Sequence, residues 1–373
     1  MSKKNIVYII SHVYKSLMFE WTFEYLLKKN KYNLAVILLN NKESELENFL
    51  KKNNVPVLRI RLANKIDYII SFIKILKYFL QHKTDIVHTH LFEASFIGLL
   101  AARLSGIKCR IHTRHNGTVN HEYYPHAVKY DKLINRLSTD IIAISKIVKN
   151  ILVDMENVNE NKITIIYHGF KLQCFNQVSE SRLIQIREKY QIQSSAYPII
   201  GVISRYIHWK GIQYIIPAFI KLKQEYPHAH LILCNANGPY SNDIKKQLSE
   251  LPSDSYTEID FESDITALYK VFDIFVHVPI NPHSEAFGQV YIESMASGVP
   301  LVATLSGIAQ EFIVDKKNAL VVPFKNSESI YQSILLLLNE KELKNNLINN
   351  ALKDVQQFSV ENMIENLERL YDK

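Results

Sequence analysis

The chain has 373 residues, of which 47% are hydrophobic and 22% charged, with a formal net charge of +7. One hydrophobic core rarely serves more than about 250–300 residues, so this length predicts two domains, and the composition excludes a long disordered tail. The longest apolar runs, such as 34–39 and 334–338, are much shorter than the roughly 20 residues of a membrane-spanning helix. The first residues lack the features of a secretory signal, and we expect a cytoplasmic protein.

Basic residues are concentrated in the first half of the chain. Residues 1–180 contain 26 Lys and Arg against 15 Asp and Glu, whereas residues 181–373 contain 18 against 22. This asymmetry indicates that the first half meets an anionic surface, such as lipid headgroups, a phosphorylated substrate or nucleic acid. Lysines scattered over a solvated surface would give the same counts.

Short apolar segments rich in β-branched residues alternate with amphipathic segments of helical length. In the first half the predicted strands are 5–10, 33–39, 56–60, 85–90, 108–113, 140–145 and 162–167. In the second half they are 197–204, 229–234, 271–278, 300–304 and 319–323. This alternation predicts parallel sheets covered by crossover helices, and therefore an α/β fold.

The alternation of strand-like and helical segments becomes irregular after about residue 171 and resumes near 197, which divides the chain into segments. We expect an N-terminal Rossmann-like domain over 1–175, a linker over 176–195 and a second α/β domain over 196–355. The remaining segment, 356–373, is expected to be helical.

One predicted helix, 66–80, is apolar around most of its circumference. Lysines edge it, at Lys65, Lys74, Lys77 and Lys83. A basic amphipathic helix of this type can lie in a membrane interface. A helix packed between a sheet and its neighbours has a similar pattern, so the sequence leaves both interpretations open.

Two carboxylates, Glu285 and Glu293, are separated by seven residues where a loop leads into a predicted helix. The segment follows a strand, and open α/β sheets bind ligands at the carboxyl ends of their strands. The free amides of Phe287, Gly288 and Gln289 at the helix start form a site for an anionic oxygen, and the glycine permits close approach. Carboxylates accept hydrogen bonds from hydroxyls, which favours ribose and hexose rings as ligands. Two isolated surface glutamates would not indicate a sugar-binding site.

A second candidate site lies near the start of the second domain. Arg205 follows the strand 197–204, and Lys210 opens the next predicted helix, 211–224. Across so short a loop the two side chains can converge on one diphosphate, with arginine supplying a fork of donors and lysine a point charge.

The stretch 285–304 closely resembles the E-x7-E signature of the family 4 retaining glycosyltransferases, which have the GT-B fold. The segment 264–276 is similar to the helix and strand that precede this signature, and Arg205 with Lys210 is similar to the family's R-x4-K-G element. The resemblance is strong over 198–324. It implies two Rossmann-like domains facing each other across a cleft, with the last helix a candidate to cross back to the first domain.

The resemblance also implies roles for individual residues. Arg205 and Lys210 would bind the donor diphosphate and stabilise the leaving nucleotide without a metal or other cofactor. Glu293 would bind the ribose hydroxyls, and Glu285 the hydroxyls of the donor sugar. Three backbone amides would face the sugar or phosphate, those of Phe287, Gly288 and Gln289.

In the first domain, His115 follows the strand 108–113 and matches a histidine that the family points towards the reacting sugar. It could hydrogen-bond a sugar hydroxyl or the acceptor, and we expect it to be catalytic together with Glu285, Arg205 and Lys210. For the nearby His88, His90 and His112 we expect structural roles. The chain lacks cysteine or histidine spacings typical of a metal site, so no metal is expected.

Three positions depart from the family pattern. The segment 10–16 contains no glycine, whereas the family usually has a glycine-rich turn after the first strand. His168-Gly169 stands where Asn-Gly is frequent, and Ala319 stands where a glycine is frequent. These changes concern the acceptor side and loop geometry more than the donor site.

We therefore expect transfer of a hexosyl unit, with retention, from a nucleoside diphosphate sugar to a hydroxyl acceptor, with UDP as the nucleotide. The resemblance favours a glycan or lipid-linked glycan acceptor in bacterial envelope polysaccharide synthesis, at the inner face of the cytoplasmic membrane. Peripheral contact with anionic lipid is consistent with the basic first half. A nucleotide-sugar 2-epimerase shares the fold but as a rule lacks E-x7-E. A nucleic-acid-binding protein is a remote alternative, because no basic recognition helix or aromatic stacking motif is present.

Overall fold

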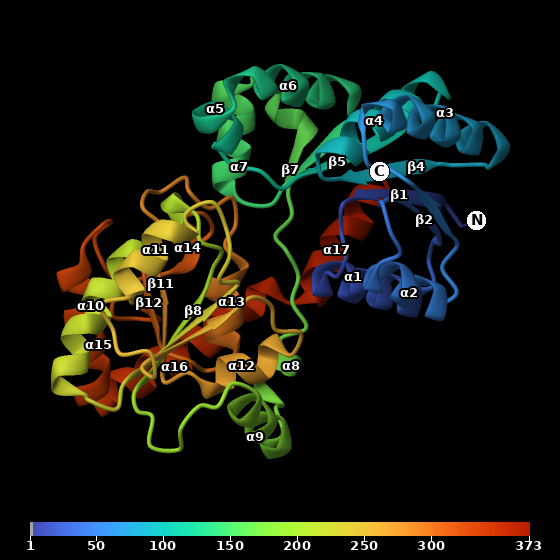
Figure 1. Cartoon of the computed structure of the whole chain (residues 1–373). Coiled ribbons are helices and arrows are strands. Elements are labelled where there is room, and N and C mark those ends of the chain that lie inside the picture. Colours follow the sequence, from blue (N-terminus) through green and yellow to red (C-terminus); the bar gives the residue numbers. More distant parts are fainter. Residues whose placement is uncertain (1–2) are drawn as a thin grey trace. The chain divides into compact units, whose positions relative to one another are not determined.

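The computed structural model describes residues 3–373, which form two compact units (Figure 1). Unit 1 comprises the chain up to Phe170 together with Phe358–Lys373, and unit 2 comprises Lys171–Gln357. Each unit is built around its own sheet, in which all strands are parallel. The expected α/β fold is confirmed.

The sheet of unit 1 has seven strands in the order β3-β2-β1-β4-β5-β6-β7. They are β1 (Asn5–Ser11), β2 (Asn33–Leu39), β3 (Val57–Ile60), β4 (Ile86–His90), β5 (Cys109–Arg114), β6 (Asp140–Ala143) and β7 (Ile163–Ile165). All seven predicted strands are present, because buried strands of a parallel sheet are continuous apolar runs. The strand order reverses between β1 and β4, which are paired in the middle of the sheet.

Helices cover both faces of this sheet. They are α1 (Leu17–Lys29), α2 (Glu45–Lys52), α3 (Lys65–Gln81), α4 (Phe92–Leu104), α5 (Val119–Tyr123), α6 (Val128–Leu137), α7 (Lys146–Asn150) and α17 (Val360–Tyr371). Successive strand residues point to opposite faces. Val7 and Ile9 therefore join the core under α3 and α4, whereas the ring of Tyr8 packs edge-on against Phe23 of α1 on the other face.

The C-terminal helix α17 belongs to unit 1, in which it packs against α1. The Phe170 amide donates to Phe358 O at 2.8 Å, and the Val360 amide donates to Phe170 O at 2.9 Å. Gly169 allows this approach, since a Cβ there would lie 2.7 Å from the Cα of Val360. At the end of α17, Tyr371 is buried beside Tyr8 of β1.

The sheet of unit 2 has six strands in the order β10-β9-β8-β11-β12-β13. They are β8 (Ile199–Ile203), β9 (His230–Cys234), β10 (Tyr256–Ile259), β11 (Ile274–His277), β12 (Leu301–Ala303) and β13 (Leu320–Val321). The edge strand β10 was not predicted, because only Ile259 of its four residues is buried. The predicted strand 271–278 starts too early, since Val271 ends a helix.

The helices of unit 2 are α8 (Gln173–Asn176), α9 (Glu180–Lys189), α10 (Ile212–Glu225), α11 (Ser241–Leu248), α12 (Ile265–Val271), α13 (Gln289–Ala296), α14 (Ala309–Phe312), α15 (Ser327–Asn339) and α16 (Lys341–Asp354). Figure 1 shows α10 and α15 side by side, where Phe219 and Ile334 are buried in the core. The predicted helix 211–224 is confirmed as α10, and the helix predicted after the loop of Glu285 is confirmed as α13. The segment 176–195 contains α9, which contacts α12.

Candidate active site

The strand order of unit 2 reverses between β8 and β11, which pair at the centre of the sheet. Open α/β sheets bind ligands outside the carboxyl ends of the strands at such a point. Arg205 lies two residues beyond the end of β8, and Lys210 ends the short turn that leads into α10. His277 is the last residue of β11, and the loop that follows it carries Glu285 to the start of α13. The two predicted motifs therefore lie at one switch point.

Glu285 is the centre of a group of polar contacts at this edge. Lys210 Nζ donates to Glu285 Oε1 at 2.5 Å, and His277 Nε2 lies 3.0 Å from the same oxygen. The backbone amide of Glu285 donates to Ser306 Oγ at 3.0 Å. Glu285 itself is 8% exposed, so these contacts hold a nearly buried carboxylate in one orientation.

The charge of Glu285 is set by these neighbours. Burial by itself would raise the pKa of the carboxyl, but the ammonium of Lys210 and the hydrogen bond from His277 lower this pKa to about 2. Burial lowers the pKa of His277, and the Glu285 carboxylate only partly opposes that shift. At neutral pH Glu285 is therefore ionised and accepts, while a neutral His277 donates through Nε2. His277 was missed from the sequence, although a histidine that ends a strand eight residues before Glu285 is a usable signal.

Two glycines allow the loops around Glu285 to approach each other. Gly211 has φ +80°, and a Cβ there would lie 1.8 Å from the carbonyl oxygen of Val278. This close approach sets the turn of Lys210 against the end of β11. Gly307 has φ +61°, and a Cβ there would lie 2.7 Å from the Cβ of Glu285. Both glycines are therefore needed where they stand.

Glu293 lies one turn inside α13, in a different environment from Glu285. Its Oε2 accepts a hydrogen bond from Tyr269 OH at 2.9 Å. Burial raises the pKa of Glu293 to about 7, and the bond from Tyr269 offsets only part of this. The two carboxylates of the motif therefore differ in protonation near neutral pH, because Glu285 has a cationic partner and Glu293 has a neutral one.

The start of α13 offers backbone donors beside these carboxylates. Gly288 is the N-cap, with φ +88°, and a Cβ there would lie 2.6 Å from the ring of Tyr291. The Phe287 carbonyl accepts from the Ile308 amide at 2.9 Å, which ties the turn to the next loop. The first amides of a helix, here including that of Gln289, have no acceptor within the helix and favour a bound anion.

Arg205 has an exposed side chain. Among residues 3–373, none forms a hydrogen bond or an ion pair with its guanidinium. The fork of donors is thus accessible to an anionic ligand.

His115 lies in unit 1, directly after β5, and belongs to a buried histidine cluster. Its Nε2 is 3.0 Å from Nδ1 of His90, and its ring stacks on His168 at 5.4 Å between centroids. Burial lowers the pKa of His115 to about 4, so the ring is neutral at pH 7. The cluster borders a cavity of about 30 Å³, which is large enough for water but too small for a sugar.

The other histidines near His115 are buried in the same sheet. His88 contacts Thr113 Oγ1 at 2.7 Å, and His112 contacts Ser95 Oγ at 2.9 Å.

The glycine-free turn after β1 places His12 at φ +54°, a conformation in which glycine would be unstrained.

Two negative findings concern metal sites and membrane spans in the described part of the chain, residues 3–373. It contains no group of three or more His, Cys, Asp or Glu side chains that could hold a metal ion. No helix in the same range is both long and apolar enough to cross a bilayer.

Known families and structures match both units of the chain. The family model for glycosyl transferases group 1 matches residues 185–354, and that for glycosyltransferase family 4 matches residues 25–173. The capsular polysaccharide biosynthesis glycosyltransferase CapM of Staphylococcus aureus is 27% identical over 385 residues, covering 100% of this chain and 98% of CapM. The alpha-monoglucosyldiacylglycerol synthase of Streptococcus pneumoniae is 30% identical over 263 residues, covering 66% of this chain and 57% of the synthase.

The fold is also that of solved glycosyltransferase structures. The crystal structure of Anabaena HepE in complex with UDP-glucose matches with a TM-score of 0.84 and 19% identity, covering 99% of this chain and 100% of HepE. The likeness to HepE and the doubly wound sheets show the GT-B fold, and the two family models, with the relatives above, identify the chain as a family 4 glycosyltransferase.

Proposed function

We propose that this glycosyltransferase moves a hexosyl unit from a nucleoside diphosphate sugar to a hydroxyl acceptor, with retention at the anomeric carbon. The observation that carries the proposal is the ion pair of Lys210 with Glu285 at the switch point of unit 2, beside the first amides of α13. This arrangement presents cationic groups, backbone donors and a fixed carboxylate on one edge of a sheet. A sugar diphosphate needs these three kinds of partner.

The donor diphosphate would be bound by Arg205, Lys210 and the amides of Phe287, Gly288 and Gln289. Negative charge develops on the diphosphate as the glycosidic bond breaks, and donors fixed in advance stabilise that charge. We propose that these cations, with the helix amides, supply the stabilisation without a metal. Turnover that is unchanged by a chelator of divalent cations is the expected result.

The two carboxylates would bind the hydroxyls of the donor. An ionised Glu285 accepts hydrogen bonds from the sugar, and Glu293 accepts them from the ribose. HepE is described in complex with UDP-glucose, which supports UDP as the nucleotide here. His115 would contribute from unit 1 as a neutral imidazole, which can donate or accept a hydrogen bond at the sugar or the acceptor.

The acceptor is proposed to be a glycan or a lipid-linked glycan of a bacterial envelope polysaccharide. The name of CapM refers to capsular polysaccharide biosynthesis, and that of the Streptococcus pneumoniae synthase to a glycolipid product. A lipid-linked acceptor would place the enzyme at the inner face of the cytoplasmic membrane, in peripheral contact with anionic lipid. The basic residues of the first half favour that location.

A panel of nucleoside diphosphate sugars tests the donor assignment. The true donor should raise the melting temperature, because a ligand that binds only the native state stabilises it. Free nucleoside diphosphate should then accumulate only when acceptor is present, and nuclear magnetic resonance of the product should show the anomeric configuration of the donor. Release of nucleotide with conversion of the sugar and no acceptor would instead indicate an epimerase. An inverted product would contradict retention.

A further inference from the structure

Helix α3 is packed against unit 1 by one face only. Ser71, Ile75 and Phe79 are buried, and the last two join the core cluster that contains Val7 and Ile9 of β1. The opposite face carries large apolar side chains exposed to solvent. They are Ile66 (70% exposed), Ile69 (66%), Ile70 (42%), Ile73 (56%) and Leu80 (71%).

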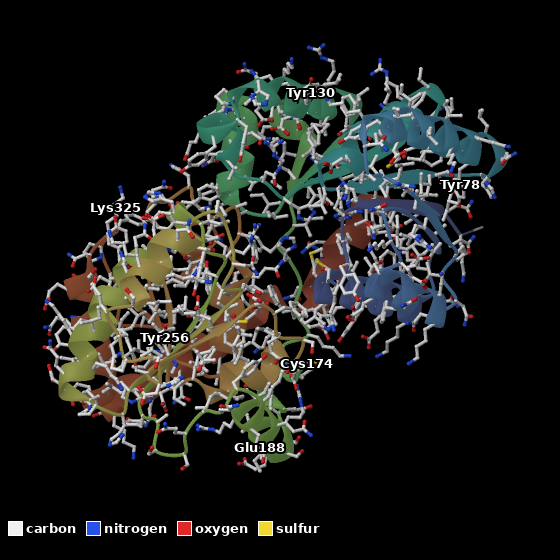
Figure 2. The ribbon with its side chains drawn as sticks, in the orientation of Figure 1. Tyr78, Tyr130, Cys174, Glu188, Tyr256 and Lys325 are labelled. Atoms are coloured by element: carbon white, nitrogen blue, oxygen red, sulfur yellow. The ribbon has the colours of Figure 1, made fainter. Side chains whose placement is uncertain are left out.

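These side chains form an apolar stripe on one face of α3, interrupted by Lys77 between Ile73 and Leu80. At about 100° per residue, the five positions fall within an arc of about 100° on the helix surface, opposite Ile75. They include five of the seven exposed isoleucine and leucine side chains in residues 3–373. In Figure 2 the label Tyr78 marks the C-terminal part of this helix. A concentration of this kind on one helix indicates an interaction surface.

Basic residues lie at the borders of the stripe and, in the case of Lys77, within it. Four exposed lysines accompany it, at Lys65, Lys74, Lys77 and Lys83. Within the described chain none of the four has an ion-pair partner. The only acidic residue of the helix, Asp67, is occupied by the capping box, in which its carboxylate accepts from the amides of Ala63 and Asn64.

We propose that α3 lies flat in the headgroup region of an anionic phospholipid bilayer, with the isoleucine stripe inserted and the lysines on lipid phosphates. An apolar stripe edged by cations is complementary to such a surface in both hydrophobicity and charge. A second copy of the chain fits less well. A two-fold contact through the stripe would bury Lys77, which lies within the same arc, and the helix has no acidic residue free to pair with it, because Asp67 is held in the capping box.

The direction of α3 places one end of the stripe near the carboxyl edge of the sheet of unit 1. Only four residues separate the end of β3 from the start of α3, so Ile66 lies towards the carboxyl edge of the sheet. His90 and His115 lie at the carboxyl ends of β4 and β5, on that edge. An inserted α3 would therefore bring lipid close to the edge where an acceptor is expected. This last step rests on the proposed function, whereas the membrane contact does not.

Sedimentation of the full chain with lipid vesicles tests the contact without donor or acceptor. Vesicles containing phosphatidylglycerol should retain the protein, and vesicles of phosphatidylcholine alone should retain at least about tenfold less. The double variant Ile69→Glu/Ile73→Glu should lose binding to both, and Lys74→Glu/Lys77→Glu should lose the preference for anionic lipid. Ile184→Glu is the matched control, because Ile184 is an isoleucine of α9 in unit 2 that is 47% exposed. It should bind as the wild type does.

Each result decides the proposal. Wild-type binding by the Ile69/Ile73 variant, or failure of the wild type to bind anionic vesicles, would overturn it. A dimer in light scattering that disappears in this variant would also overturn it, in favour of contact between copies. Unchanged melting temperatures show that the variants fold, and their unchanged turnover of a water-soluble acceptor would separate this proposal from the proposed function.

Discussion

Lys210 Nζ lies 2.5 Å from Glu285 Oε1, although the two residues are 75 positions apart in the chain. The contact depends on Gly211, because a side chain at that position would collide with the carbonyl oxygen of Val278. One ion pair therefore joins the element that follows β8 to the element that follows β11. The two halves of the proposed donor site are positioned relative to each other by the protein itself.

Replacement of Lys210 tests this arrangement. Lys210→Ala should lower turnover at least about 100-fold, as loss of one fixed donor to a developing oxyanion does. It should also lower the free energy of unfolding by about 1–3 kcal/mol, because Glu285 loses a charged partner while nearly buried. Steady-state kinetics and denaturant unfolding measure the two effects.

Lys221 of α10 supplies the matched control for this variant. Its ammonium pairs with Glu328 at the surface, so Lys221→Ala should change neither quantity measurably. Turnover of Lys210→Ala within a few-fold of wild type would show that the ion pair has a purely structural role.

The raised pKa of Glu293 predicts that donor affinity depends on pH. If the ionised carboxylate accepts the ribose hydroxyls, affinity for the nucleotide sugar should increase as the pH rises through about 7 and then level off. Titration calorimetry between pH 5.5 and 8.5 measures this, because the diphosphate of a sugar nucleotide does not titrate in that range. Glu293→Gln should bind weakly and independently of pH. An equal pH dependence in wild type and variant would remove Glu293 from the assignment.

The raised pKa of Glu293 also predicts that the stability of the unliganded protein falls with rising pH, whereas donor affinity rises. The folded-state pKa of Glu293 lies above its ordinary value of 4.5, so its contribution to stability is full below pH 4.5 and is lost as the pH rises through about 7. The melting temperature of Glu293→Gln minus that of the wild type should therefore be larger at pH 8 than at pH 5. Thermal unfolding of the unliganded protein at both values distinguishes this from an effect on binding.

Much of the fold could be predicted from the sequence, because a buried parallel strand is a continuous apolar run and nearly every such run became a strand. The edge strand β10 could not, since three of its four residues remain accessible and its sequence resembles a loop. The helix α3 fitted two interpretations because periodicity reveals apolar faces but not which of them a domain covers. The structure shows one face packed and the other exposed.

The candidate site was predictable in its motifs but less so in its partners. Glu285 and Lys210 stand in local patterns with recognisable spacing. Tyr269 could not be assigned to Glu293, because that contact joins two helices, α12 and α13, whose packing depends on the whole domain. The contact of His88 with Tyr371 spans 283 residues and depends on the return of α17 to unit 1. Contacts of this kind follow from tertiary packing and leave no local signature.

Gly211 and Gly106 have similar backbone angles but different surroundings, and replacing each by alanine should have different effects on stability. Gly211→Ala meets both an unfavourable φ of +80° and the carbonyl of Val278, whereas Gly106→Ala meets a φ of +76° with nothing within 4 Å of the new Cβ. Gly106→Ala should cost about 1–2 kcal/mol, the price of the left-handed conformation alone. Gly211→Ala should cost more and should also reduce turnover, because the backbone shift moves Lys210. Equal losses of stability would show that the loop relaxes around the added methyl group.

The histidine cluster of unit 1 predicts sensitivity to acid. Burial lowers the pKa of His88 to about 3 and that of His115 to about 4, so the folded protein binds fewer protons than the unfolded chain below the ordinary value of 6.5. Stability should therefore be full above pH 6.5 and decline as the pH falls from there towards 3 to 4. Unfolding in denaturant at pH 7 and pH 5 measures this decline.

Tyr371→Phe tests how this cluster is held by the C-terminal helix. Tyr371 OH lies 2.6 Å from Nδ1 of His88 and also hydrogen-bonds the hydroxyl of Tyr8, so its removal leaves buried polar atoms without a partner. We expect a loss of about 1–3 kcal/mol at pH 7. The loss should be the same at pH 5, because His88, with a pKa of about 3, is neutral in the folded protein at both pH values. Tyr25→Phe, which removes a hydroxyl bonded to Glu361 at the surface of the same helix, should cost less than about 1 kcal/mol. A Tyr371→Phe variant as stable as this control would mean that the buried hydrogen bonds of the Tyr371 hydroxyl contribute little to holding α17 against the sheet.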